Sequence, residues 1–433
     1  MRLGGSAAGS GTCTCRDFMN CRASAYHGRM NEMHDIAIVG GGLVGSSLAI
    51  ALEGCGFRVA LIEAALPHVS AQPSYDERNL ALARASINAL QSLGVWAHVA
   101  TQPAAIERIR ISRRGDFGTV KLDAAKLGLP AFGAVVPARE LGNALLLRLH
   151  ECTTLERIAP AQLIGIERQA DRIELSLRAD AGERRLSTRL LVGADGTASF
   201  VRESAGIGVQ RTDYGQSAFV TTLTTQHALD GTAHERFTDS GPVALLPMAG
   251  NRAGLVLTVA TEDAERVAAL DDAAFLALLH ERFGYRVGRF SRPGKRKPYP
   301  LARLLAERLT APRTVLVGNA AQTVHPLGAQ GFNLGLRDAL SLSELLLAAR
   351  RDDADPGSAD LLARYVERRT PDRAATTSFS DDLVRLMGND SPPLRVLRSF
   401  AFSALDRLAP LKRRVALRGM GFRGDVSQRG LSR

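Results

Sequence analysis

The chain has 433 residues, of which 45% are hydrophobic and 23% charged, and its formal net charge is +11. These proportions are ordinary for a globular protein and leave room for two domains with separate cores. The apolar runs end at charges well before the roughly 20 residues that cross a bilayer, and the five cysteines are too scattered for a disulfide framework or a metal site. The composition therefore excludes an integral membrane protein and a disulfide-rich secreted protein, and it indicates a reducing cytoplasm.

Residues 1–32 contain Gly, Ser, Ala and Arg without helical or strand periodicity. They predict a disordered extension, because nothing in them can bury a core. Four arginines against two acids are compatible with a transit peptide, but apolar amphipathic anchors are missing. We favour an initiation codon assigned too far upstream, with Met30 or Met33 as the true start.

The first strong pattern is a dinucleotide-binding βαβ unit over residues 35–63. An apolar strand runs into Gly40, Gly42 and Gly45, which have G-x-G-x-x-G spacing, and a helix follows. The first glycine permits a tight turn, the second lets a pyrophosphate approach the backbone, and the third lets the helix pack on the strand. The helix N-terminus favours the anion. Glu63 ends the second strand and is placed to accept hydrogen bonds from an adenosine ribose.

The rest of the chain predicts alternating helices and strands. We expect a helix that ends at Gly94, a helix after Pro137, strands over 162–192, a sheet over 216–259, a short buried strand at 314–317 and mainly helices from 331 onward. The sheet over residues 216–259 lies outside the dinucleotide fold. We interpret it as the floor of a substrate domain.

Two further glycine turns follow predicted strands. The first is Leu-Val-Gly-Ala-Asp-Gly at residues 191–196, and the second extends over residues 315–339 and contains Gly-Asn-Ala-Ala-Gln-Thr-Val-His-Pro. The order and spacing of the three motifs resemble the single-component FAD-dependent aromatic monooxygenases, the para-hydroxybenzoate hydroxylase family. The resemblance covers roughly residues 34–425. The Glu-Arg-Phe-Thr run at 235–238 is similar to the ubiquinone-biosynthesis hydroxylases, especially their methoxyphenol branch.

This resemblance implies a reaction and its partners. The cofactor would be FAD, the electron donor NADPH or NADH, and the substrates O2 and a polyprenylated (methoxy)phenol whose ring is hydroxylated through a flavin C4a-hydroperoxide. A ubiquinone-biosynthesis protein complex is a candidate partner. No metal ligand is expected, and the residue that assists phenol deprotonation stays unknown, although His325 beside the flavin is a candidate acid–base group.

The resemblance also assigns residues to the cofactor. In the family an Asp-Gly pair contributes to FAD and NAD(P)H binding, and Asp195 and Gly196 match it. A helix that starts at residues 330–331 would direct N–H groups at the flavin edge that becomes negative on reduction. The predicted cofactor-binding residues are Gly40, Gly42, Gly45, Glu63, Arg78, Arg139, Asp195, Gly196, Gly318, Asn319, Pro326, Gln330, Gly331 and Asn333.

Two positions depart from the family pattern. Gly318-Asn319 stands where most relatives have Gly-Asp, and Gly328-Ala329-Gln330-Gly331 stands where many have Ala-Gly-Gln-Gly. Asn319 keeps an acceptor oxygen without the charge, so FAD binding should survive. The second departure moves a glycine by one position and concerns the flavin contacts of Ala329.

The implied fold is α/β: a Rossmann-like FAD-binding domain with an inserted mixed-sheet substrate domain and a helical C-terminal region. The predicted boundaries are an extension at 1–32, two parts of the FAD-binding domain at 33–110 and 111–210, the substrate sheet at 211–312, the last FAD motif and its helices at 313–390, and a basic helical tail at 391–433.

The sequence also argues against two other classes of flavoprotein. A flavin halogenase needs a Trp-x-Trp signature that the single Trp96 cannot supply, and a disulfide reductase would need a second dinucleotide motif. A flavin-dependent reductase of a prenyl lipid and a non-catalytic flavoprotein scaffold subunit remain open.

The C-terminal tail suggests a surface partner. Ten basic residues and two acids lie over residues 394–433, and Leu394, Leu397, Ala401, Leu405 and Leu408 recur at helical spacing. Nucleic acid is not expected, because basic residues are not interleaved with aromatic ones on a folded module. A solvated basic helix is one reading, and contact with anionic lipid is the other. We expect a cytoplasmic protein, with peripheral contact at the inner membrane as the second location.

Overall fold

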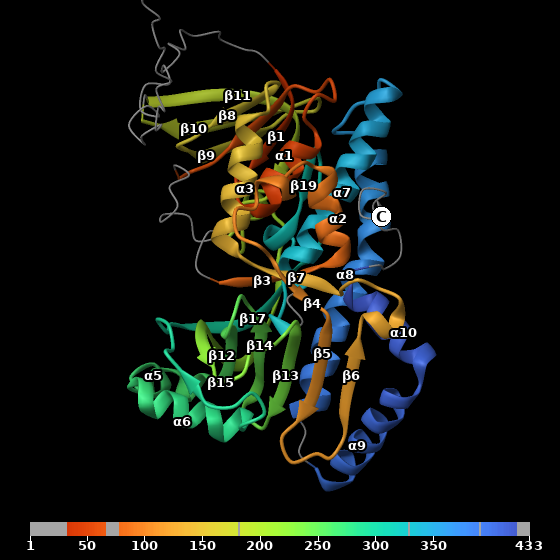
Figure 1. Ribbon diagram of the computed structural model, residues 1–433. Coiled ribbons are helices and arrows are strands. Elements are labelled where there is room, and N and C mark those ends of the chain that lie inside the picture. Colours follow the sequence, from red (N-terminus) through yellow and green to blue (C-terminus); the bar gives the residue numbers. More distant parts are fainter. Residues whose placement is uncertain (1–32, 66–77, 181, 328–329, 389–390, 422–433) are drawn as a thin grey trace, which may run out of the picture. The chain divides into compact units, whose positions relative to one another are not determined.

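Three sheets organise the part of the chain that the computed structural model describes, residues 33–65, 78–180, 182–327, 330–388 and 391–421 (Figure 1). Residues 33–433 form one compact unit by themselves. The expectations for residues 1–32, for the Gly328-Ala329 pair and for residues 422–433 lie outside the described residues.

The first sheet has eight strands and carries the dinucleotide motif. Its path is β18-β19-β11-β1-β2-β8, and β10 joins β11 to β9. The bounds are β1 (His34–Val39), β2 (Val59–Ile62), β8 (Leu155–Ile158), β9 (Ala161–Arg168), β10 (Ile173–Ala179), β11 (Gly182–Gly193), β18 (Thr310–Ala311) and β19 (Thr314–Leu316). The five strands β19, β11, β1, β2 and β8 are parallel, and burial on both faces explains the continuous apolar runs of β1 and β2.

Helices cover this parallel sheet. α1 (Leu43–Ala51) packs against both α3 (Ala138–His150) and α7 (Gln330–Arg351), and α4 (Phe200–Ser204) follows β11. Almost every residue of α1 is buried, because it lies between the sheet and its neighbours. A short helix, η6 (Gly318–Ala320), follows β19.

The second sheet has nine strands and a different cover. Its path is β20-β17-β12-β15-β14-β13-β5-β6, with β16 beside β12. The bounds are β5 (Arg108–Arg113), β6 (Thr119–Asp123), β12 (Val209–Thr225), β13 (Thr232–Thr238), β14 (Gly241–Pro247), β15 (Arg252–Ala260), β16 (Phe290–Ser291), β17 (Pro298–Ala306) and β20 (Gln322–Thr323). Alternate residues of β12, β14 and β15 form a separate core with α5 (Ala264–Ala268) and α6 (Asp272–Phe283).

The remaining elements connect the two large sheets. β3 (Asn79–Ala83), β7 (Gly133–Pro137) and β4 (Ala104–Ile106) form a small sheet next to α2 (Arg84–Ser92). The short helices are η3 (Trp96–His98), η4 (Ala125–Leu127) and η5 (Thr261–Asp263), and the chain continues into α8 (Ala359–Gly388), α9 (Pro392–Arg407) and α10 (Ala409–Gly419). Within the described ranges, no helix is both long and apolar enough to cross a membrane.

The α/β fold with a mixed second sheet and a helical C-terminal region is confirmed. The predicted domain boundaries divide both large sheets. β5 and β6 lie within the ranges assigned to FAD binding, but β5 hydrogen-bonds to β13 of the second sheet, and β20 also pairs with that sheet. β18 lies within the range assigned to the substrate sheet but pairs with β19 of the first sheet. Helices α5 and α6 had no counterpart in the sequence prediction. β5 joins β13 across more than a hundred residues, which no local pattern reveals.

Candidate functional site

The three sequence motifs meet at one edge of the eight-stranded sheet. Val39 pairs with Gly193, and Gly193 pairs with Leu316, so the carboxyl ends of β1, β11 and β19 are aligned. The loop after each strand therefore leaves at the same edge, which is where nucleotide cofactors bind in open parallel sheets. A Cβ atom on Gly40 would lie only 2.4 Å from the carbonyl oxygen of Ala194, so the first two loops touch.

The first turn depends on its glycines. Gly40 has a φ of +104°, which side chains rarely tolerate, and Gly42 is the N-cap of α1. A Cβ atom on Gly45 would lie 1.9 Å from the carbonyl oxygen of Gly40. The helix can approach the strand this closely only because Gly45 lacks a side chain.

A cleft beside this turn contains Glu63. The Glu63 carboxylate accepts hydrogen bonds from the N–H groups of Gly41 at 2.6 Å and Ala65 at 3.0 Å. Leu61, Leu146, Leu149 and Arg157 also line the cleft. Its apolar walls and terminal carboxylate fit an adenosine group. Sequence reasoning missed the contributions of α3 and β8, because they depend on the packing of α3 against α1 and on the parallel pairing of β2 with β8.

Hydrogen bonds connect the second motif to α4 and to the third motif. The Asp195 carboxylate accepts hydrogen bonds from the Ser199 hydroxyl at 2.5 Å and from Val201 N–H at 3.0 Å, so it caps the start of α4. Gly196 has a φ of +83°, and nothing would crowd a Cβ atom there. Arg202, further along α4, donates to the carbonyl oxygen of Ala320 at 3.1 Å, which ties the second motif to the third.

The third motif is braced by a buried carboxylate. Asp338 of α7 accepts hydrogen bonds from Gly318 N–H at 3.1 Å, from the Gln322 amide at 2.6 Å and from Arg369 Nε at 2.8 Å. Asp338 and Arg369 expose only 3% of their side chains. The turn at Gly318, which has a φ of +60°, is therefore fixed from below, while the Asn319 side chain is exposed above it.

A second ion pair extends this brace. Asp372 of α8 accepts hydrogen bonds from both Arg337 and Arg369 at 2.7 Å. Burial would raise the pKa of the Asp372 carboxyl, but the two guanidinium groups hold it at about 2. The buried charges below the motif are thus matched by partners, as a stable interior requires.

The start of α7 combines buried and open positions. Gln330 is buried, whereas a Cβ atom on Gly331 would meet nothing within 4 Å. The Asn333 amide accepts from Ala83 N–H at 2.9 Å and donates to the carbonyl oxygen of Ala81 at 3.0 Å. Its side chain thus joins α7 to β3.

The two predicted arginine contacts come from adjacent segments. Ala138 N–H donates to the carbonyl oxygen of Arg78 at 2.7 Å, which brings the backbone of Arg78 close to that of Arg139. The Arg78 guanidinium lies 5.9 Å from the ring centre of Tyr299, on β17 of the second sheet. Arg139 is half-buried next to Glu140. Arg78 thus lies where the two sheets approach each other.

His325, next to the predicted flavin contact Pro326, has a free donor. Its Nδ1 atom accepts a hydrogen bond from Leu327 N–H at 3.2 Å, so the ring proton of the neutral tautomer is on Nε2. This Nε2 atom is buried and has no partner within the described chain. Burial lowers the pKa of His325 to about 4, which keeps the imidazole neutral.

A tyrosine holds the His325 ring in place. The Tyr214 ring packs edge-to-face against it with centres 4.9 Å apart, and the Tyr214 hydroxyl donates to Asp381, which also binds Arg303. Burial, together with Asp381, raises the pKa of the Tyr214 hydroxyl, so it keeps its proton. The orphan donor of His325 therefore has a fixed orientation beside the third motif.

These features fit a bound FAD. The motif loops that follow the parallel strands provide a glycine turn at residues 40–45 and a cleft that ends at Glu63. They also lead to the open Gly331 and to the buried, unpaired donor of His325. In the part of the chain that is described, no three His, Cys, Asp or Glu side chains are arranged to hold a metal ion.

The chain matches known proteins over most of its length. The FAD binding domain family covers residues 33–380. Ubiquinone hydroxylase UbiL of Rhodospirillum rubrum is 38% identical over 394 residues, which are 91% of each chain. The 3-demethoxyubiquinol 3-hydroxylase of Escherichia coli is 35% identical over 396 residues, covering 90% of this chain and 99% of the relative.

Solved structures share the fold. The p-nitrophenol 4-monooxygenase PnpA of Pseudomonas putida DLL-E4 superposes with a TM-score of 0.75 at 20% identity, covering 91% of this chain and all of that one. Together with the sequence relatives, this places the chain in the family of FAD-dependent aromatic monooxygenases, which bind FAD and typically take electrons from NAD(P)H.

Proposed function

We propose that the chain hydroxylates the ring of a polyprenylated (methoxy)phenol in ubiquinone biosynthesis, with NAD(P)H and O2 as cosubstrates. The observation that supports this most strongly is the end-to-end similarity to two enzymes named as hydroxylases of ubiquinone or its precursor, at 35–38% identity. Bound FAD would supply the redox chemistry, and the protein would have to orient the ring and exclude water.

The proposed FAD site uses the three motif loops. We assign the pyrophosphate to the glycine turn at residues 40–45, the adenosine ribose to Glu63, and the ribityl chain to the exposed Asn319. The isoalloxazine ring would be held by the segment around Pro326 and the open Gly331, and Arg78 and Arg139 are further proposed FAD contacts. The buried Asp338 would act through the backbone by holding the turn at residues 318–319.

His325 is the proposed contact to the substrate oxygen. Its Nε2–H is the buried donor without a partner in the described chain, and a hydrogen bond to a charged phenolate is stronger than one to a neutral phenol. Such a bond would favour the phenolate and so raise the electron density of the ring. Because the imidazole is neutral and its Nδ1 already accepts a hydrogen bond, His325 would donate without giving up its proton.

The C-terminal helices support a membrane-surface partner for this function. On α9, Val396, Leu397 and Phe400 are 52%, 65% and 62% exposed, while Arg398 is buried against Asp116. The leucines that recur at helical spacing therefore do not form the buried face of α9, because Leu397 is exposed. We propose that this apolar stripe and the basic residues near it contact anionic lipid, close to a membrane-dissolved substrate.

Complementation tests the proposed activity. The chain, expressed in an Escherichia coli strain that lacks its 3-demethoxyubiquinol 3-hydroxylase, should restore ubiquinone, and Asn319→Leu should restore less. A methoxyphenol precursor that still accumulates with well-expressed, yellow protein would contradict the substrate assignment. Product with a saturated prenyl bond and no O2 uptake would favour the reductase, and ubiquinone restored by a flavin-free variant would favour the scaffold.

A further inference from the structure

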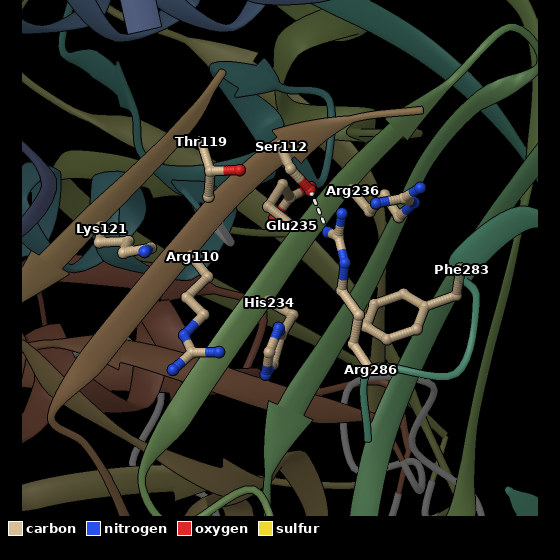
Figure 2. Close-up of a pocket in the computed structure, with 9 residues that line it drawn as sticks. All are labelled: Arg110, Ser112, Thr119, Lys121, His234, Glu235, Arg236, Phe283 and Arg286. Carbon is tan, nitrogen blue, oxygen red and sulfur yellow. Dashed lines mark hydrogen bonds between the residues drawn. The ribbon is translucent and has the colours of Figure 1, made fainter. Parts of the chain in front are cut away.

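A cavity of about 210 Å³ on the nine-stranded sheet has three arginines and a lysine in its lining (Figure 2). Arg110 comes from β5, Lys121 from β6, Arg236 from β13, and Arg286 from the loop after α6. The imidazole of His234, on β13, also lines the cavity. None of the residues of the three FAD motifs lines this cavity.

Strand alternation places these cations on one face of the sheet. His234 pairs with Arg110, and Arg236 pairs with Ser112, so their side chains leave the sheet together on the side of α6. Glu235 lies between His234 and Arg236 in the sequence and also lines the cavity. Its side chain leaves β13 on the opposite face, so no carboxylate of this strand projects among the cations.

The cations of the cavity are only partly neutralised by the described protein: the Asp406 carboxylate lies near Lys121, and Arg110, Lys121 and Arg286 are exposed to solvent. Arg110, Arg236 and Arg286 form no ion pair there, and Arg236 Nη1 is a buried donor without a partner. The Arg286 guanidinium donates only to the Ser112 hydroxyl, at 3.0 Å. Burial and the neighbouring guanidinium groups lower the pKa of Arg236 to about 10. The electrostatic repulsion among these cations therefore destabilises the empty site.

We propose that this cavity binds a phosphoryl oxyanion. Three guanidinium groups offer forked donors that match phosphate oxygens, the Lys121 ammonium adds a point charge, and the Ser112 and Thr119 hydroxyls can donate as well. A multivalent anion would neutralise several cations at once, which one carboxylate cannot do. The phosphoryl group could come from a free polyphosphate or from a lipid headgroup, and the chemistry of recognition is the same.

Titration with inorganic pyrophosphate tests the site. Binding to the FAD-loaded full chain is measured by calorimetry at constant ionic strength, with sodium chloride as the matched salt. We expect saturable binding that Arg236→Gln and Arg286→Gln each weaken about tenfold or more, because each removes charge-assisted hydrogen bonds. Lys121→Gln, at an exposed position, should weaken it less, because one point charge rather than a forked donor is lost.

The control is Arg178→Gln, which removes an exposed arginine from β10 of the other sheet. It should leave pyrophosphate binding unchanged, and all variants should keep the FAD content of the parent. Equal binding by the parent and Arg236→Gln, or no binding beyond that of sodium chloride, would overturn the proposal. If Arg236→Gln fails to fold, the Lys121→Gln titration decides in its place.

Vesicles separate the two sources of phosphate. Binding to phosphatidylglycerol vesicles that pyrophosphate displaces, and that Arg236→Gln weakens, would assign a lipid headgroup. Pyrophosphate binding without any effect of Arg236→Gln on vesicles would assign a free phosphate compound. A poly-glutamate peptide that binds in the cavity while pyrophosphate does not would contradict the proposal and identify an acidic protein segment.

Discussion

Two groups of charged residues, one beside each large sheet, differ in whether they have partners. Below the eight-stranded sheet, Asp338, Arg369 and Asp372 form buried ion pairs at 2.7–2.8 Å. In the nine-stranded sheet, Arg110 and Arg236 face a cavity without an anionic partner in the described chain, and Glu235, on the other face, has no cationic partner there. Paired buried charges hold a loop in place, whereas unpaired ones are costly and therefore indicate a missing ligand.

The largest effect is expected where a paired charge is broken. Asp338→Ala leaves Arg369 buried and frees the turn at Gly318, and should lower the free energy of unfolding by about 3–5 kcal/mol. FAD content should fall with it. Urea denaturation measures the stability. The control Glu183→Ala breaks the exposed pair with Arg178 and should cost less than about 1 kcal/mol. Equal losses in the two variants would contradict the claim that the buried ion pair contributes more to stability than the exposed one.

The second-largest effect is expected from a steric change in the glycine turn at residues 40–45. Gly45→Ala places a methyl group 1.9 Å from the carbonyl oxygen of Gly40, so the helix α1 must move and the stability should fall by about 1–3 kcal/mol. The flavin-to-protein ratio should drop strongly. Gly388→Ala, where a Cβ atom meets nothing, is the matched control and should keep both properties. Full flavin content in Gly45→Ala would contradict the prediction, because FAD would then still bind with α1 displaced from the turn.

The unpaired Glu235 predicts a pH effect of opposite sign to that of a salt-bridged acid. Burial raises the pKa of its carboxyl to about 7, so the native state holds the proton more tightly than the unfolded state. Stability from this group is complete below about pH 4.5 and is lost as the pH rises through about 7. Glu235→Gln should therefore gain stability relative to the parent over this window, by at most about 3 kcal/mol. A pH-independent difference between the two proteins, measured by chemical denaturation, would place a hidden partner beside Glu235.

The smallest effect concerns α9, which packs on β6 at the edge of the nine-stranded sheet. Replacing the exposed Leu397 and Phe400 by Ser should weaken binding to anionic vesicles about tenfold, since two apolar side chains no longer leave water. Stability should hardly change. Leu147→Ser, equally exposed on α3, should not affect vesicle binding. Equal cosedimentation of all three proteins would reject α9 as the contact surface.

The sequence predicted the elements of the parallel sheet well, because their signals are local. The strand, the three glycines and Glu63 lie within one short segment, and the structure shows a strand, a tight turn and a buried helix there. The meeting of the three motifs needed the pairing of β11 with β1 and β19, which the family resemblance implied and periodicity alone could not.

The sequence failed where distant segments combine. Asp338 was noted only as part of a motif, yet it binds Arg369, 31 positions away, and this partner has no pattern of its own. Asn333 was predicted to contact the cofactor, and its amide is used instead to join α7 to β3; the cofactor role stays a prediction. The cation cavity was not predicted, because its three arginines come from two strands and a loop, and its lysine from a third strand, in an arginine-rich chain.

Incorporation of heavy-isotope oxygen tests the central claim most directly. The FAD-loaded protein is mixed with NAD(P)H, labelled O2 and a polyprenyl-methoxyphenol, and the product is analysed by mass spectrometry. The account predicts one labelled oxygen atom on the ring for each NAD(P)H consumed, with a lower yield for His325→Leu at unchanged flavin content. Oxidation of NAD(P)H without labelled product, in a protein whose flavin is fully bound, would contradict it.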